Sequence, residues 1–129
     1  MNNRVLFGMI AVSVVMIFVA VATDVFWIGR AAGAFPPSID IPARIYSAFG
    51  LPDLVLSFFL YAGAAGLLKR KSWGVYASMA GLGMWLFDSL LVLGITGTDR
   101  IDIVGPSLLF SLFAIGFLFL YSEVYISES

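Results

Sequence analysis

The 129-residue chain contains neither cysteine nor histidine. Without cysteine it can form no disulfide, no thiolate nucleophile and no iron–sulfur cluster. Without histidine it lacks the most common general base and the usual ligand of zinc, copper and haem. Catalysis would have to use Asp, Glu, Tyr, Lys or Arg, and the remaining oxygen ligands would suit only a hard cation. We therefore expect no catalytic residue, no metal site and no cofactor, and we favour a function other than catalysis.

Charged residues are also scarce, at 12% of the chain, whereas 61% of the residues are hydrophobic and the mean hydropathy is +1.03. A soluble domain has about 25% charged residues, and a disordered chain is polar and highly charged. The net charge of −1 leaves no basic excess to neutralise phosphates, so we expect no nucleic-acid partner. The composition predicts an integral membrane protein that forms a single domain over residues 1–129.

Four long apolar stretches follow one another along the sequence. A membrane-spanning helix needs about 20 such residues, and we predict spans over residues 5–28, 52–68, 73–95 and 106–121. One long and two short connections join them, which is typical of an all-α, four-helix up-down bundle. Lipid gives helices no hydrophobic reason to associate, so stripes of small residues in the second and third spans are expected to face each other. These residues are Ala62, Gly63, Ala65 and Gly66, and Gly74, Ala77, Ser78, Gly81 and Gly83.

The long first connection, residues 29–51, contains a second helical pattern. Asp40 can cap a short helix over residues 41–50, and Pro42 suits its first turn. Apolar residues on one face of this helix indicate that it lies in the membrane interface. The alternative is a longer second span that begins near Ala43 and is kinked at Pro52.

The basic residues set the expected orientation. Lys69, Arg70 and Lys71 fill a very short connection on the same side as both termini, while Arg30, Arg44 and Arg100 lie on the opposite side. Positively charged short loops stay in the cytoplasm. We therefore predict cytoplasmic N- and C-termini in a plasma or inner membrane, with Trp27 near the outer interface.

Carboxylates provide the only chemical signal in the spans. Asp88 lies within the third span, roughly 10 Å below its outer end, where an ionisable group is costly and suggests a site. Two interpretations of Asp88 stay open. It either holds neighbouring helices together through hydrogen bonds or binds a ligand. Asp24 and Asp53 lie near the outer ends of their helices. Each either caps its helix end at the membrane interface or belongs to the same site as Asp88.

These residues define a hypothetical acidic pocket that opens outward around Asp88. It would combine Asp24 and Asp53 with nearby polar side chains at a similar depth, which are Ser57, Tyr61 and Ser111. Arg30, Arg44 and Arg100 would lie in the loops above it. Such a pocket would suit a cation, a proton or an amphipathic molecule with a polar head.

Residues 45–94 resemble the DoxX-like group of small four-helix membrane proteins. The resemblance depends on Phe49-Gly50-Leu51-Pro52-Asp53, on the small-residue second span, on the basic turn before Trp73 and on the intramembrane Asp88. It implies a small four-helix membrane fold and no particular activity.

Three functions are compatible with these features. The weak polar interior and the shortage of chain outside the spans favour a non-catalytic accessory or assembly subunit of a membrane complex. The alternative is a stand-alone binder or transporter of a small cation or amphipathic molecule at Asp88, and the third is an acid-catalysed lipid or isoprenoid enzyme. The expected partners are membrane lipids and either other membrane subunits or further copies of the chain.

Overall fold

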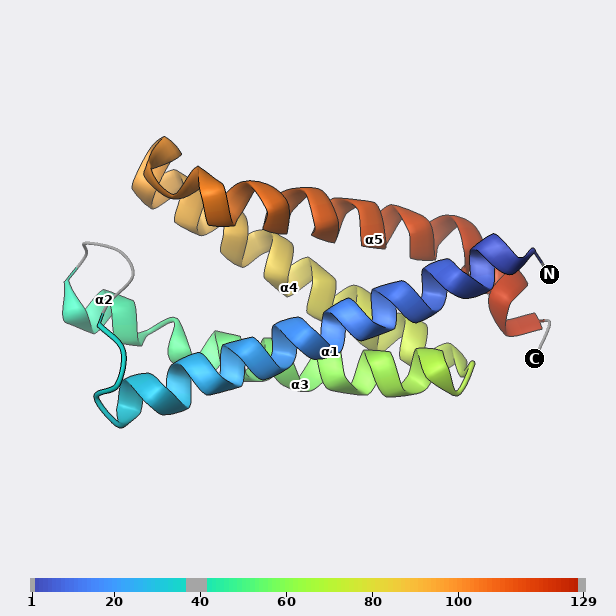
Figure 1. The fold of residues 1–129 in the computed structure, drawn as a ribbon, viewed down its shortest axis with the longest axis horizontal. Helices are drawn as coiled ribbons and strands as arrows, with labels where there is room; N and C mark the ends of the chain where they lie inside the picture. The colour runs from blue at the N-terminus through green and yellow to red at the C-terminus, as the bar shows by residue number, and fades with distance from the viewer. Residues whose placement is uncertain (1, 37–41, 128–129) are drawn as a thin grey trace.

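The computed structural model describes residues 2–36 and 42–127, and its regular structure there is entirely helical. Figure 1 shows the arrangement of the elements. In chain order they are α1 (Asn3–Ala31), α2 (Ala43–Ser47), α3 (Gly50–Leu68), α4 (Ser72–Thr96), the 3-10 turn η1 (Gly97–Arg100) and α5 (Ile101–Ser127). The predicted all-α class is confirmed.

Three helical stretches are long and apolar enough to cross a membrane, namely Asn3–Ala31, Ala43–Leu68 and Ser72–Ser127. The last stretch has 56 residues and comprises α4, η1 and α5. Many large apolar side chains point outward along these helices, among them Phe7, Phe58 and Phe119. An exposed apolar surface of this extent matches a protein surrounded by lipid.

The last helix begins earlier than predicted. The structure starts α5 at Ile101, whereas the sequence pattern placed the start at Pro106. Pro106 therefore lies inside α5, where its missing N–H removes the hydrogen bond to the Asp102 carbonyl in the first turn of the helix. The break between α4 and α5 is concentrated at Gly97, whose φ of 61° lies in the left-handed region. The connection that the predicted spans leave between residues 95 and 106 is therefore shorter than predicted.

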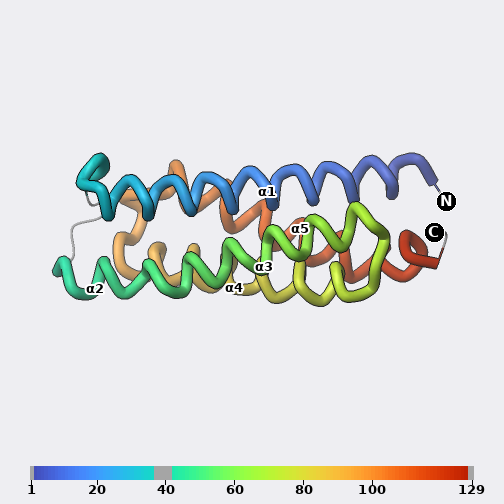
Figure 2. The backbone as a smooth tube through the Cα atoms, turned by 90° about the horizontal axis from the view of Figure 1, so that it is seen from below, coloured from blue at the N-terminus to red at the C-terminus, as the bar shows by residue number. Residues whose placement is uncertain are grey.

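The second helical stretch is broken near its start. Helix α2 ends at Ser47, a turn follows at Ala48 and Phe49, and α3 continues in nearly the same direction (Figure 2). Pro52 has no N–H to donate to the carbonyl of Ala48, which accounts for the break at this point. This geometry favours the alternative of a longer second stretch that begins near Ala43. The predicted cap, Asp40, lies outside the described residues.

The helices pack in the order α1, α3, α4, α5. Helix α3 lies against both α1 and α4, and α4 lies against α5. Helices α1 and α5 meet near the chain termini, where the Phe117 ring packs over Gly8, and they diverge toward the other end (Figure 1). Both termini and the α3–α4 turn occupy one end of the bundle, and α2 and η1 occupy the other.

The α3–α4 contact uses part of the predicted stripes of small residues, whereas Ala65 is exposed and a Cβ atom at Gly83 would meet nothing within 4 Å. Gly63 lies against the backbone of Ser78, and Gly66 lies against the backbone of Gly74. The space for any side chain at these positions is already filled by the opposite helix. Close backbone approach of this kind gives the dispersion contacts that hold helices together in lipid.

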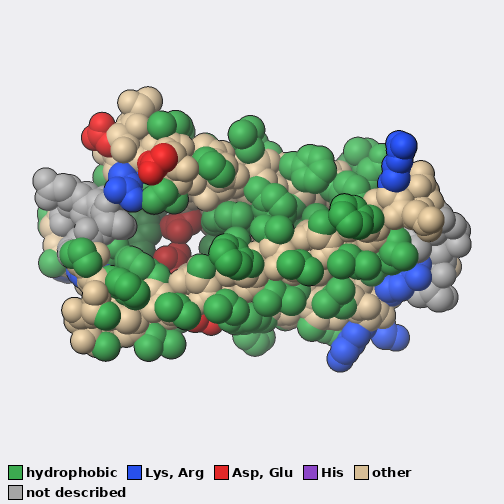
Figure 3. Space-filling model, viewed as in Figure 1, with side chains coloured by type: hydrophobic (Ala, Val, Ile, Leu, Met, Phe, Trp, Pro, Cys, Tyr) green, Lys and Arg blue, Asp and Glu red, His purple; other side chains and the backbone are tan. Residues whose placement is uncertain are grey.

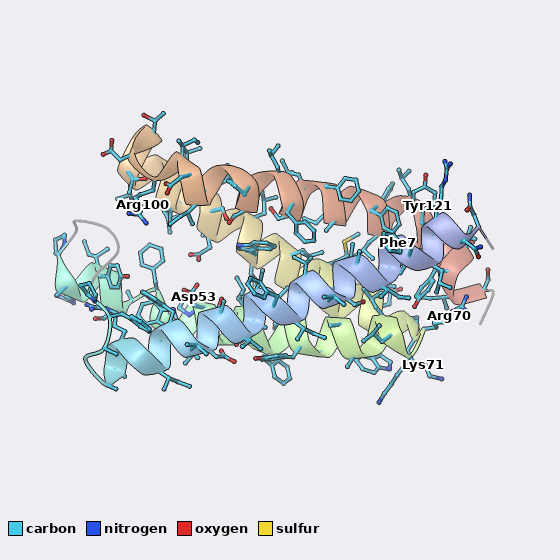
Figure 4. The ribbon with its side chains drawn as sticks, viewed as in Figure 1. Phe7, Asp53, Arg70, Lys71, Arg100 and Tyr121 are labelled. Atoms are coloured by element: carbon cyan, nitrogen blue, oxygen red, sulfur yellow. The ribbon has the colours of Figure 1, made fainter. Side chains whose placement is uncertain are left out.

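The end of the bundle that carries the termini is closed by Tyr125, which is 2% exposed. Its hydroxyl donates a hydrogen bond to the Leu67 carbonyl at 2.7 Å. Arg70, in the α3–α4 turn, donates from Nε to the Tyr125 carbonyl at 3.0 Å and lies 4.7 Å from the centre of the Tyr125 ring. These contacts join the end of α5 to the α3–α4 turn, and Figure 4 shows Arg70 at this end of the bundle.

Candidate functional site

A cavity of about 200 Å³ lies where α1 and α5 diverge, at the end of the bundle that carries α2 and η1. We call it the acidic hollow. Figure 3 shows acidic side chains at the bottom of a recess between these two helices. The lining comes from every helical element, and it includes Trp27, Tyr46, Asp53, Asp88, Arg100 and Ser107.

Asp53 of α3 and Asp88 of α4 meet in this hollow, with their carboxyl groups within hydrogen-bonding reach of each other. The hairpin geometry brings them to the same level. Asp53 precedes Lys69 by 16 residues and Asp88 follows Lys71 by 17, so both lie about 25 Å from the shared turn. The sequence analysis placed both acids in one hypothetical pocket, and counting outward from this turn gives the geometric reason why these two meet.

Trp27 of α1 fixes the position of Asp53. The indole Nε1 donates a hydrogen bond to Asp53 Oδ2 at 2.7 Å. Asp53 Oδ1 is shielded from solvent, and no hydrogen-bond donor of the described residues reaches it. The sequence pattern indicated only an interfacial position for Trp27, although a partly buried indole N–H usually has a polar partner.

Arg100 is the arginine that lines the hollow, at its mouth and on η1. Within residues 2–36 and 42–127, it forms no ion pair and donates no side-chain hydrogen bond. The other two predicted arginines lie elsewhere. Arg30 donates to the Phe35 carbonyl at 3.1 Å and lies 4.5 Å from the centre of the Tyr46 ring, and Arg44 is exposed on α2.

Ser57 and Ser111 do not line the acidic hollow. Both are buried, but their hydroxyls donate to carbonyls of their own helices, at 2.9 Å to Leu54 and at 2.8 Å to Ser107. A serine in an apolar helix commonly satisfies its hydroxyl in this way, because a backbone carbonyl is always within reach.

Asp24 and Tyr61 form a separate contact between α1 and α3. The Tyr61 hydroxyl lies close to the Asp24 carboxylate, and neither residue lines the acidic hollow. Of the three acids that the sequence grouped together, the structure thus brings only Asp53 and Asp88 into one cavity.

A second, larger cavity of about 720 Å³ lies along α3 and α4, on the other side of the acid pair. We call it the apolar groove, because its lining is mostly apolar and includes Met79, Met84, Phe87 and Leu91. Asp53, Asp88 and Phe49 line both cavities. The acid pair therefore separates a partly polar hollow from an apolar surface.

In the described part of the chain, no three acidic side chains converge on a point where they could hold a metal ion. Comparison of the chain with protein-family models, curated proteins and solved structures gives no match. The resemblance to DoxX-like proteins therefore stays a prediction.

Proposed function

We propose that the chain crosses a plasma or inner membrane four times and that both of its termini lie in the cytoplasm. As one helix, the 56-residue stretch Ser72–Ser127 would be about 84 Å long, whereas the hydrocarbon core is about 30 Å thick. The reversal at Gly97 supports two crossings, because it lays α5 alongside α4 (Figure 1). The basic turn at Lys69–Lys71 supports the cytoplasmic assignment of the end that carries the termini.

Single introduced cysteines test this topology directly, because the natural chain has none. Thr98→Cys lies in η1 and Ser72→Cys lies at the start of α4, and both positions are exposed. A membrane-impermeant maleimide added to intact cells should label Thr98→Cys, and it should label Ser72→Cys only after lysis. Labelling of both positions in intact cells would contradict four crossings of this orientation.

We further propose that the acidic hollow binds the cationic group of a small amphipathic molecule. The observation that carries this proposal is the meeting of Asp53 and Asp88 in a cavity that opens between α1 and α5. Apart from the Asp88 carboxyl, no donor of the described residues is near Asp53 Oδ1, so this oxygen can accept a hydrogen bond from a ligand. An ammonium group supplies three N–H donors and a compensating charge.

The size of the hollow limits what it can hold. Pockets for drug-sized molecules run to roughly 300–1,000 Å³, so a cavity of about 200 Å³ suits a head group alone. The rest of the ligand must lie outside the hollow. Its apolar part would face lipid or the outward side chains of α1 and α5, which suits an amphipathic molecule better than an inorganic cation.

Titration with dodecylamine in dodecyl maltoside micelles tests the site. Trp27 and Trp85 line the hollow and report binding by fluorescence, while Trp73 lies at the start of α4, near the other end of the bundle. Asp88→Asn should weaken binding at least about tenfold, because a buried ion-pair partner is removed. Asp102→Asn is the matched control, since Asp102 is exposed and does not line the hollow.

Dodecanol, which has the same chain without the charge, should not distinguish Asp88→Asn from the natural protein. Equal affinity of dodecylamine for the natural protein, Asp53→Asn and Asp88→Asn would overturn the proposal, provided that far-UV circular dichroism shows intact helices. The accessory-subunit and lipid-enzyme functions stay predictions, because no contact among the described residues favours either.

A further inference from the structure

The acidic hollow carries charges of both signs at different depths. Asp53 and Asp88 come from α3 and α4, inside the bundle, and Arg100 comes from η1, at its end. Figure 4 shows Arg100 closer to the end of the bundle than Asp53, with its side chain directed toward the hollow. The two sets of charge therefore face the same cavity, one at its mouth and one at its floor.

Arg100 does not neutralise the acid pair, because it forms no ion pair within the described residues. It also leaves its sequence neighbours Asp99 and Asp102 unpaired, although both are exposed nearby on η1 and α5. A half-buried guanidinium that lines a cavity without a partner lacks compensation for its desolvation. Its planar group of N–H donors matches a phosphate or a carboxylate in a two-point contact.

Two other donors, one in the hollow and one beside it, are already engaged. The Trp27 N–H is donated to Asp53, and the Arg30 guanidinium stacks on Tyr46. Arg100 is therefore the cationic side chain among the lining residues that is available to an anion.

Building on the proposed function, we propose that the head group bound in the acidic hollow is zwitterionic, with its ammonium group on Asp53 and Asp88 and its phosphate on Arg100. The order of the groups matches the order of the charges. In an aminoalkyl phosphate ester the amine is terminal, the phosphate follows, and any apolar chain is attached beyond the phosphate. An amine at the floor therefore places the phosphate at the mouth and the chain outside.

The position of the mouth agrees with this ligand chemistry. Under the proposed topology, η1 lies at the outer surface of the membrane, where the phosphates of lipids are found. Arg100 at this level meets the phosphate without drawing it into the hydrocarbon region, and the acid pair receives the amine roughly one or two helical turns deeper. The same chemistry is present in a membrane lipid and in a free aminoalkyl phosphate, and the experiment distinguishes these sources.

The test compares three probes by tryptophan fluorescence in dodecyl maltoside. They are a 12-carbon lysophosphatidylethanolamine, dodecylamine and free phosphoethanolamine. Arg100→Gln should weaken binding of the lysolipid at least about tenfold, as expected for loss of a charge-assisted contact. Dodecylamine should bind this variant as well as before or more tightly, because a repelling charge is removed. Arg44→Gln, an exposed arginine outside the hollow, is the matched control and should change neither affinity.

The natural protein gives a second readout that does not depend on a variant. It should bind the lysolipid at least about tenfold more tightly than dodecylamine, because only the lysolipid engages both charges. Free phosphoethanolamine that binds as tightly as the lysolipid would identify a soluble ligand, and weak binding would identify a lipid. This comparison identifies the source of the ligand, and the comparison of the lysolipid with dodecylamine tests the zwitterionic head.

Equal affinities of the natural protein for the lysolipid and dodecylamine would overturn the zwitterionic head, and so would an Arg100→Gln variant that binds the lysolipid normally. In both cases the proposed cation site stands if Asp88→Asn still weakens dodecylamine binding. If Asp88→Asn weakens neither probe, the proposed function itself fails.

Discussion

The contact between Gly66 and Gly74 should decide how firmly α3 and α4 are held together, and Gly74→Ala tests this. A Cβ atom at residue 74 would lie 2.5 Å from both Gly66 Cα and Leu67 N, whereas ordinary contacts start at 3.4 Å. The opposing atoms belong to backbone, so no side-chain rotation can relieve the overlap. The helices would have to separate locally by about 1 Å, a gap that forfeits a quarter to a half of the dispersion energy of each affected atom pair.

Overpacking of this kind costs about 1–3 kcal/mol, and the higher helix propensity of alanine returns up to about 1 kcal/mol. We therefore expect Gly74→Ala to lower the free energy of unfolding by up to about 2 kcal/mol relative to the natural chain, and by about 1–3 kcal/mol relative to an alanine that meets no other atom. Gly83→Ala is the matched control, because Gly83 lies on the same helix and a Cβ atom there would meet nothing within 4 Å. It should be neutral or stabilising by up to about 1 kcal/mol.

Reversible unfolding by dodecyl sulfate in mixed micelles, followed by far-UV circular dichroism, measures both variants against the natural chain. If Gly74→Ala is as stable as Gly83→Ala, close backbone contact does not hold these helices together and the reasoning is refuted. Gly66→Ala gives an independent check from the opposite helix, because its Cβ atom would lie 2.8 Å from Gly74 N.

Three further predictions concern single contacts and use the same unfolding assay. Tyr125→Phe removes the 2.7 Å hydrogen bond to the Leu67 carbonyl and should cost about 0.6–1.7 kcal/mol, the range for hydrogen bonds between membrane helices; an unchanged stability would show that this contact does not close the end of the bundle. Trp27→Phe keeps an aromatic ring but removes the donor to Asp53 Oδ2, so we expect a loss of about 1–3 kcal/mol and weaker dodecylamine binding reported by Trp85; normal binding would exclude Trp27 from positioning the acid. Gly97→Ala places a side chain at φ 61° and ψ −134° and should cost about 1–3 kcal/mol, whereas Gly94→Ala, inside α4 with no atom near its Cβ position, should not destabilise the protein; similar losses in both variants would exclude backbone strain as the cause.

The apolar runs predicted the helices well, because a chain in lipid must satisfy its backbone hydrogen bonds locally and helices do so. The α3–α4 contact was predictable for a related reason, since Gly66 and Gly74 flank a turn too short for any other arrangement. The start of α5 was not predictable from proline alone. Pro106 marks a place where a helix can begin, but residues 101–105 also have helical geometry because Gly97 had already reversed the chain.

The candidate site was only partly predictable. Depth along each helix identified Asp88 as unusual, but depth says nothing about which face a side chain occupies. Ser57 and Ser111 are at a similar depth and turn to their own backbones. Trp27 and Arg100 reach the hollow because α1 and α5 diverge at one end, a tertiary feature that no local pattern of residues encodes.

The divergence of α1 and α5 would separate two tasks in the proposed binding site. Charge would be recognised on α3 and α4, two helices whose backbones are in direct contact. The width of the acidic hollow is set by the gap between α1 and α5, which have few contacts with each other. Substitutions of Val104 and Ser107, which line the hollow from α5, could therefore change the bulk of the molecule admitted while the acids stay in register. The affinity for a charged group and the size of the molecule that the hollow admits could then evolve independently in a chain of 129 residues.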